Sequence, residues 1–172
     1  LWARQIAIVQ LSKTKLTRLK LIDTPFAPGQ LLLWPKQKRL LAADQFGGLL
    51  ASIDLDSAQI VAVMDTESHN IRGLMLESNQ DSFAFSHQML NQAVPTKKQR
   101  VFWGTLMQNI VRSVDGQYWR TLEGQAGNNK TPVRLGRWSL VTVGDVKKAT
   151  ADPGTLLRMQ TGRIAVALSG IH

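Results

Sequence analysis

Pro-Gly-Gln-Leu-Leu at residues 28–32, followed by Arg-Leu-Leu-Ala at residues 39–42, is the stretch that decides the fold, because both parts return later in the chain. Arg-Gly-Leu-Met-Leu at residues 72–76 and Phe-Ala-Phe-Ser at residues 83–86 follow them at an offset of 44 residues. A period of about 40 to 50 residues made of short strands is typical of a ring or stack of small sheets, as in a β-propeller.

Apolar runs separated by polar, Pro and Gly residues predict eight strands in the first half of the chain. Ser-Lys-Thr at residues 12–14 is a hairpin turn between two such runs, and Gly-Gly at residues 47–48 is a tight turn. Four strands in about 44 residues correspond to one propeller blade. The predicted strands cover residues 5–11, 16–22, 30–34, 39–43, 49–55, 60–64, 71–76 and 82–86.

A third copy begins with Pro-Gly-Thr-Leu-Leu at residues 153–157, which lies 125 residues after the first copy. This unit therefore contains roughly 37 extra residues, which we place in an insertion at about 91–132. Trp103, Leu106, Met107 and Ile110 within it have helical spacing.

We predict an all-β fold, a β-propeller-type arc of four-stranded antiparallel blades with about three units and one long insertion. The whole chain, 1–172, forms one partial propeller domain with units at about 5–46, 47–90 and 109–172. The chain begins with Leu and stops after a predicted strand, so we expect a segment of a longer protein that completes a larger ring.

Composition excludes several classes of site. The 172 residues include no cysteine, which removes disulfides, thiolate metal sites and covalent haem attachment within this chain. The net charge of +9 is uneven: residues 41–95 hold 7 acidic and 1 basic side chain, whereas both flanks are basic. Most basic residues are spaced singly, which favours solvated strand edges over an acidic protein partner or nucleic acid. No apolar run is long enough for a membrane span, and no signal peptide is visible.

The densest polar cluster combines histidine, arginine and amide side chains around the second unit. Since neighbouring antiparallel strands bring one strand's start beside the next strand's end, we expect these residues at one rim of the blade, where the insertion begins. If the rim is a functional site, the insertion would be its lid. Arg72 would bind an anion, and His69 or His87 would act in acid–base chemistry or bind a metal. The candidate binding residues, called the rim cluster below, are His69, Asn70, Arg72, His87, Trp103, Asn109 and Arg112.

Three interpretations of the rim cluster stay open. The favoured one is that its side chains fasten the insertion to the blade, with no catalytic residue and no metal. The second is an enzyme of lactonase or hydrolase type with His69, Arg72 and His87 in its site. The third is a structural or adhesive surface module. No Gly-x-Ser-x-Gly elbow supports a serine nucleophile.

The chain also resembles the YVTN-type β-propeller repeats of bacteria over most of its length. The resemblance rests on residues 27–29 and 41–48, and on Ile-Asp-Leu at residues 53–55. His-Asn-Ile-Arg-Gly-Leu at residues 69–74, His87-Gln88, Trp103-Gly104 and residues 152–154 are similar to a subgroup joined to c-type cytochrome or di-haem peroxidase-like modules.

This resemblance implies an exported protein, periplasmic or at the cell surface, whose propeller acts beside a redox module. The chain departs from the pattern because it has no Cys-x-x-Cys-His haem motif. We therefore expect a non-catalytic binding or scaffold segment without its own cofactor. Its expected partners are further propeller blades or another protein, a c-type cytochrome among them, which would hold any haem.

Overall fold

The computed structural model describes residues 3–91, 93–98, 106–126, 131–136, 139–144 and 150–171. All eight strands predicted in the first half are present, with small changes at their ends. They are β1 (Gln5–Leu11), β2 (Leu16–Asp23), β3 (Pro28–Trp34), β4 (Arg39–Asp44), β5 (Leu49–Asp54), β6 (Gln59–Asp65), β7 (His69–Leu76) and β8 (Ser82–Leu90).

The second half adds β9 (Met107–Asp115), α2 (Gly116–Ala126), β10 (Val133–Arg134), β11 (Leu140–Thr142), β12 (Thr150–Arg158) and β13 (Ile164–Ile171), and a short 3₁₀ turn, η1 (Pro35–Gln37), precedes β4. The apolar spacing at residues 103–110 suggested a helix. For the described residues this interpretation is wrong, since Met107 and Ile110 lie in strand β9. A short apolar run can fit the period of a helix as well as that of a strand. Here the segment forms a strand because its backbone pairs with β8.

Short polar side chains form the turns. Asp54 Oδ1 accepts hydrogen bonds from the backbone N–H and the hydroxyl of Ser57, which closes the β5–β6 turn. Asp115 Oδ1 accepts from the backbone N–H groups of Gln117 and Tyr118, at 2.8 and 3.0 Å. These donors would otherwise be unsatisfied at the helix start, so Asp115 fixes the point where β9 ends and α2 begins.

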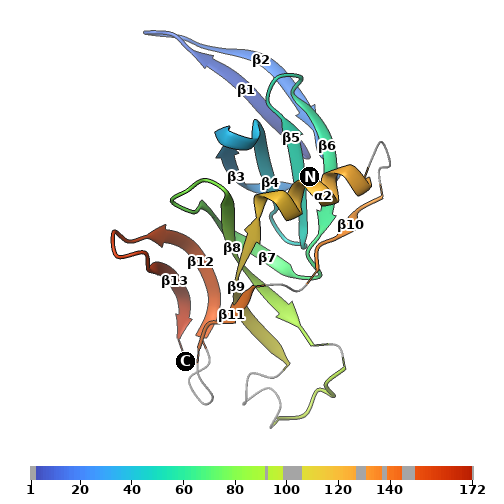
Figure 1. Cartoon of the computed structure of the whole chain (residues 1–172), viewed down its shortest axis with the longest axis vertical. Coiled ribbons are helices and arrows are strands. Elements are labelled where there is room, and N and C mark those ends of the chain that lie inside the picture. Colours follow the sequence, from blue (N-terminus) through green and yellow to red (C-terminus); the bar gives the residue numbers. More distant parts are fainter. Residues whose placement is uncertain are drawn as a thin grey trace.

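The strands form four sheets that follow one another in chain order (Figure 1). Sheet A is the β1–β2 hairpin, sheet B has the order β10-β6-β5-β4-β3, sheet C has the order β11-β9-β8-β7, and sheet E is the β12–β13 hairpin. Strand β3 lies beside β7, and β12 lies across β7, β8 and β9. The prediction of an all-β, propeller-like arc is confirmed.

The sheets divide the chain at other points than the predicted units. Strands β3 to β6 form one antiparallel four-stranded blade, so the predicted boundary at residues 46/47 falls inside sheet B. Strand β10 then pairs in parallel with β6, which departs from a purely antiparallel blade. Turn residues alone cannot distinguish a turn inside a blade from a connection between blades, because both carry the same Gly and Asp signals.

The extra residues do not form one continuous insertion at about 91–132. They fall in two places, between β8 and β9 and between β9 and β11, so that β9 and α2 both lie within the predicted insertion. Residues 92 and 99–105 of the first segment lie outside the described residues. In the second, α2 and β10 leave sheet C to contact sheet B, and β11 returns to pair with β9.

The β7–β8 hairpin follows the β3–β4 hairpin at 43 residues rather than at the predicted 44. Leu32 pairs with Leu41, and Met75 pairs with Ala84, so both strands advance by 43. Because successive side chains of a strand alternate between the two faces, a one-residue error in the offset assigns every side chain to the wrong face. The structural offset brings Leu41 and Ala84 onto equivalent positions, each facing the sheet that follows in the chain.

Three apolar cores lie between the successive sheets. Ile6 and Ile22 of sheet A pack on Ala42, Ala51 and Ile53 of sheet B. The largest core lies between sheets B and C and contains Trp34, Leu41, Leu50, Met64, Ile71, Phe83, Phe85 and Val114. Trp119, Leu122 and Ala126 of α2 complete this core, so the helix is a wedge between the two sheets. Leu156 of sheet E packs on Met75 and Ala84 of sheet C.

Candidate functional site

The rim cluster is divided by the sheet that carries it. Side chains that alternate along β8 point to opposite faces, so Phe85 and His87 face sheet B while Ser86 and Gln88 face sheet E. Trp103 lies outside the described residues. The structure therefore brings the remaining six residues into one region of sheet C but does not gather them in one site.

One part of the cluster is an amide ladder across three strands. Asn70 Nδ2 donates to Gln88 Oε1 at 2.6 Å, and Gln88 Nε2 donates to Asn109 Oδ1 at 3.1 Å. Gln88 and Asn109 are buried, and Asn70 has a positive φ of 52°. Asparagine tolerates this left-handed conformation better than most residues, and its side chain is satisfied by the ladder. These amides hold β7, β8 and β9 together.

His87 and Arg112 lie on the other face, between sheets B and C. Both side chains are fully buried, and Arg112 Nη1 donates to the backbone carbonyl of Thr66 at 3.3 Å. The guanidinium of Arg112 lies 5.5 Å from the centre of the Phe85 ring. Neither ring nitrogen of His87 has a hydrogen-bond partner among the described residues. Burial, aided by the positive charge of Arg112, lowers the pKa of His87 to about 3.

His69 and Arg72 occupy the exposed edge of β7. His69 lines a polar cavity of about 610 Å³ together with Asp65, Glu67, Ser68 and Gln108. Arg72 instead reaches toward sheet E, with Nη2 4.0 Å from Asp152 Oδ1. Among the described residues no group of three His, Asp or Glu side chains could hold a metal ion. His87 does not line this cavity, so the two histidines do not share a site.

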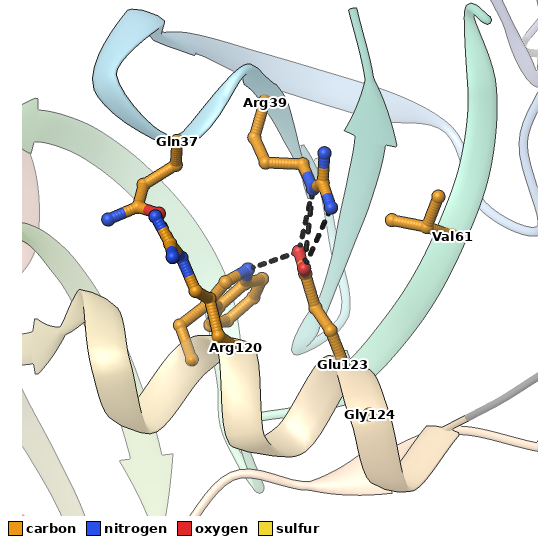
Figure 2. Close-up of a pocket in the computed structure, with 7 residues that line it drawn as sticks. Gln37, Arg39, Val61, Arg120, Glu123 and Gly124 are labelled. Atoms are coloured by element: carbon orange, nitrogen blue, oxygen red, sulfur yellow. Dashed lines mark hydrogen bonds and ion pairs between the residues drawn. The ribbon is translucent and has the colours of Figure 1, made fainter.

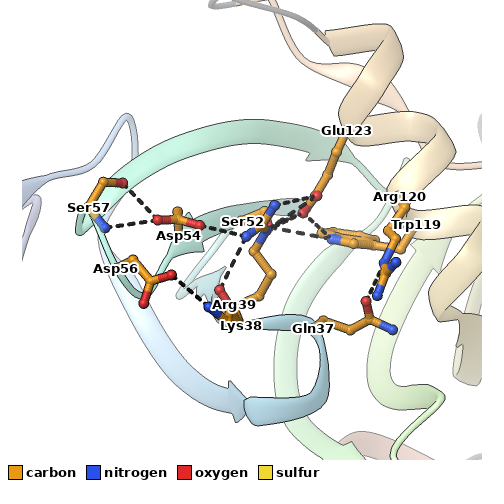
Figure 3. Close-up of polar contacts among 10 residues, drawn as sticks. All are labelled: Gln37, Lys38, Arg39, Ser52, Asp54, Asp56, Ser57, Trp119, Arg120 and Glu123. Atoms are coloured by element: carbon orange, nitrogen blue, oxygen red, sulfur yellow. Dashed lines mark hydrogen bonds and ion pairs between the residues drawn. The ribbon is translucent and has the colours of Figure 1, made fainter.

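The sequence analysis missed a second polar centre, which lies between helix α2 and sheet B. There the carboxylate of Glu123 accepts hydrogen bonds from four donor atoms. Arg39 Nε and Nη2 donate to its two oxygens at 3.1 and 3.2 Å, and Trp119 Nε1 donates to Oε1 at 2.9 Å. The hydroxyl of Ser52 donates to the same oxygen. Figure 3 shows how β4, β5 and helix α2 bring Arg39, Ser52 and Trp119 to this carboxylate.

Arg39 connects this centre to the β5–β6 turn. Its Nη1 donates to Asp54 Oδ2 at 2.8 Å, while Ser57 holds the pKa of Asp54 below its usual value through backbone and side-chain hydrogen bonds. The side chains of Arg39 and Glu123 are 22% and 11% exposed, so this ion pair is much better shielded than the Lys38–Asp56 pair, at 70% and 72%. Removing one partner of the shielded pair should therefore cost more stability than removing one partner of the exposed pair, because it leaves a shielded charge uncompensated.

A cavity of about 450 Å³ opens beside Glu123 (Figure 2). Gln37, Arg39, Trp119, Arg120 and Glu123 line it, and Arg120 donates from Nε to Gln37 Oε1. Because Arg39, Ser52 and Trp119 already satisfy the carboxylate, Glu123 is poorly suited to abstract a proton. The hydrogen bonds from Arg39 and Ser52 to Glu123 instead attach helix α2 to sheet B. The i, i+4 spacing of Trp119 and Glu123 was a sequence signal for a shared helix face.

No protein-family model and no curated protein matches this chain. Among solved structures, the chain is similar to hydrazine synthase from Kuenenia stuttgartiensis, with a TM-score of 0.67 and 17% sequence identity. The match covers 93% of this chain and 42% of that chain. At this identity the likeness concerns the fold, and it agrees with the propeller-like arc of sheets. In the described part of the chain, no helix has the length and apolar character needed to cross a membrane.

Proposed function

We propose that this chain is a non-catalytic binding or scaffold segment of an exported redox protein, of the YVTN-type subgroup associated with c-type cytochromes. The observation that carries the proposal is that most side chains of the rim cluster are bonded within sheet C or packed between sheets B and C. Asn70, Gln88 and Asn109 bind one another, and His87 is sealed between two sheets. A site for chemistry would instead present such groups to a cavity.

Further support comes from the sequence resemblance and from the fold shared with a hydrazine synthase. The exposed apolar side chains of the two outer hairpins also suit a scaffold. Val9, Leu11 and Leu16 are more than half exposed on sheet A, as is Leu157 on sheet E. Such surfaces favour contact with other protein. Any haem would belong to the partner, and the location would be the periplasm or the cell surface.

The proposal is tested by purifying the tagged chain from its source and recording protein and haem absorbance in one size-exclusion run. We expect it in the periplasmic or surface fraction, co-eluting with a haem-containing species. The same chain made in a host without c-type cytochromes is the control and should be colourless. A colourless peak from the cytoplasm of the source would contradict both the redox association and the location.

The lactonase-like or hydrolase-like alternative would require His69, Arg72 and His87 to act together. His69 lines the 610 Å³ cavity, but Arg72 is turned toward Asp152 and His87 faces the buried B–C core. Assay of ester and lactone hydrolysis by the same purified protein distinguishes the two functions. Turnover that is lost in a His69→Gln variant would favour the enzyme.

A further inference from the structure

Two polar contacts between helix α2 and the segment from η1 into β4 flank the cavity beside Glu123. Arg39 of β4 donates to Glu123. Arg120 of α2 donates from Nε to Oε1 of Gln37 in η1. The two contacts lie side by side in Figure 2. Arg120 and Glu123 are three residues apart, a spacing that places helical side chains on one face. The cavity therefore has fixed polar groups from both the helix and the sheet.

The charges that line this cavity do not balance. Two positive side chains, Arg39 and Arg120, and one negative side chain, Glu123, line it, which leaves a surplus of one positive charge. Arg39 is compensated by Glu123, and its Nη1 also donates to Asp54 Oδ2 at 2.8 Å. Within the described part of the chain, Arg120 forms no ion pair, and its partner is the neutral amide of Gln37. The surplus charge therefore lies on Arg120.

The guanidinium of Arg120 is held in place but keeps two donor groups for a ligand. Its Nε is used by Gln37, whereas Nη1 and Nη2 have no acceptor among the residues that the structure describes. Paired guanidinium N–H groups bind the two oxygens of a carboxylate in parallel. The neighbouring contact shows this geometry, because Nε and Nη2 of Arg39 donate to the two oxygens of Glu123. Arg120 can hold a second carboxylate in the same way.

The cavity also has space for the rest of a small molecule. Its volume of about 450 Å³ lies within the range of small-molecule sites. Gly124 lines it, and a Cβ added to this glycine would have no atom within 4 Å. Val61 and Trp119 give the lining an apolar part. The cavity thus combines one available cationic group with apolar wall and open space.

We propose that this cavity binds a small monocarboxylate with an apolar body, whose oxygens accept hydrogen bonds from Nη1 and Nη2 of Arg120. One negative charge matches the surplus of one positive charge. A phosphate group carries more than one negative charge near neutral pH, and the excess would lie close to the carboxylate of Glu123. The ligand is bound without being changed, and its binding does not depend on the redox association of the chain.

Calorimetric titration of the purified chain with benzoate tests the proposal, and benzamide, which has the same shape without the charge, is the matched ligand. We expect benzoate to bind at one site and benzamide to bind at least about tenfold more weakly. Inorganic phosphate is the third probe and should bind more weakly than benzoate. In NMR spectra, benzoate should shift the indole N–H signal of Trp119 but not that of Trp34, which donates to the carbonyl of Gln80.

Arg120→Gln should weaken benzoate binding by about tenfold. Arg163→Gln is the control, because it removes the same charge from an exposed arginine between β12 and β13 and should leave the affinity unchanged. Gly124→Leu should abolish binding by filling the open space while the cationic groups remain. The proposal is overturned by no saturable benzoate binding, by equal binding of benzamide, by tighter binding of phosphate, or by unchanged benzoate binding in Arg120→Gln or Gly124→Leu.

Discussion

At the scale of single residues, Glu123 decides where the helix lies. Its carboxylate accepts hydrogen bonds from Arg39, Ser52 and Trp119, which come from β4, β5 and α2. The positive charge of Arg39 is shielded from water and depends on Glu123 and Asp54 for compensation. The sequence analysis noticed Arg39 as part of a repeat but could not pair it with a side chain 84 residues away.

Glu123→Ala should lower the free energy of unfolding by about 3 kcal/mol, because it leaves the shielded guanidinium of Arg39 partly uncompensated. Asp56→Asn is the matched control, since it removes a carboxylate from the exposed ion pair with Lys38 and should cost under about 1 kcal/mol. Urea unfolding of the three proteins measures both values. An equal loss of unfolding free energy in the two variants would show that the Glu123–Arg39 pair contributes no more than the exposed Lys38–Asp56 pair.

His87 should make stability depend on pH. Its pKa is about 3 in the folded protein, against 6.5 when exposed, so the unfolded chain binds more protons between these values. Stability is therefore fully present above pH 6.5 and falls as the pH falls toward 3. At pH 4.5 the loss from this one group is about 2–3 kcal/mol.

The comparison of the unmodified protein with His87→Phe isolates this effect. Phenylalanine fills the site beside Phe85 without titrating, so the variant should lose about 2–3 kcal/mol less than the parent between pH 7 and 4.5. Carboxylates contribute equally to both proteins and cancel. Urea unfolding at the two pH values is the measurement, and the same loss in both proteins would place His87 in contact with water.

At the scale of elements, glycine allows the hairpin of sheet E to lie against sheet C. A Cβ on Gly73 would lie 2.4 Å from the carbonyl oxygen of Gly154 and 3.0 Å from the backbone nitrogen of Leu156. Ser86, opposite Gly73, donates its hydroxyl to the same carbonyl of Gly154 at 2.6 Å. The two backbones touch here, so the position has no space for a side chain.

Gly73→Ala should therefore destabilise the protein by about 1–3 kcal/mol, because the β12 backbone must move away. Gly124→Ala is the control in helix α2, where no atom lies within 4 Å of the added Cβ, and it should stabilise by up to about 1 kcal/mol. Thermal unfolding gives the sign of each change. A stabilised Gly73→Ala variant would contradict the close contact between the sheets.

At the scale of the whole molecule, the apolar cores between successive sheets hold the described sheets in their arc. Helix α2 completes the largest of these cores, which lies between sheets B and C.

The sequence by itself determined the eight early strands and the propeller-like class, because alternation of apolar residues and turn chemistry are local properties. The sequence also predicted that the polar residues of β7 and β8 lie in one region of the sheet. It could not assign faces, since an offset wrong by a single residue turns every side chain around, as Leu41 and Ala84 illustrate.

Only the tertiary structure decided which hairpins share a sheet, that α2 wedges between sheets B and C, and that Glu123 meets Arg39. These contacts join residues far apart in the chain, and their energy depends on burial that no local pattern contains. The same reason separates His87 from His69: two residues near one strand end differ in chemistry because a sheet has two faces, one sealed and one open to water.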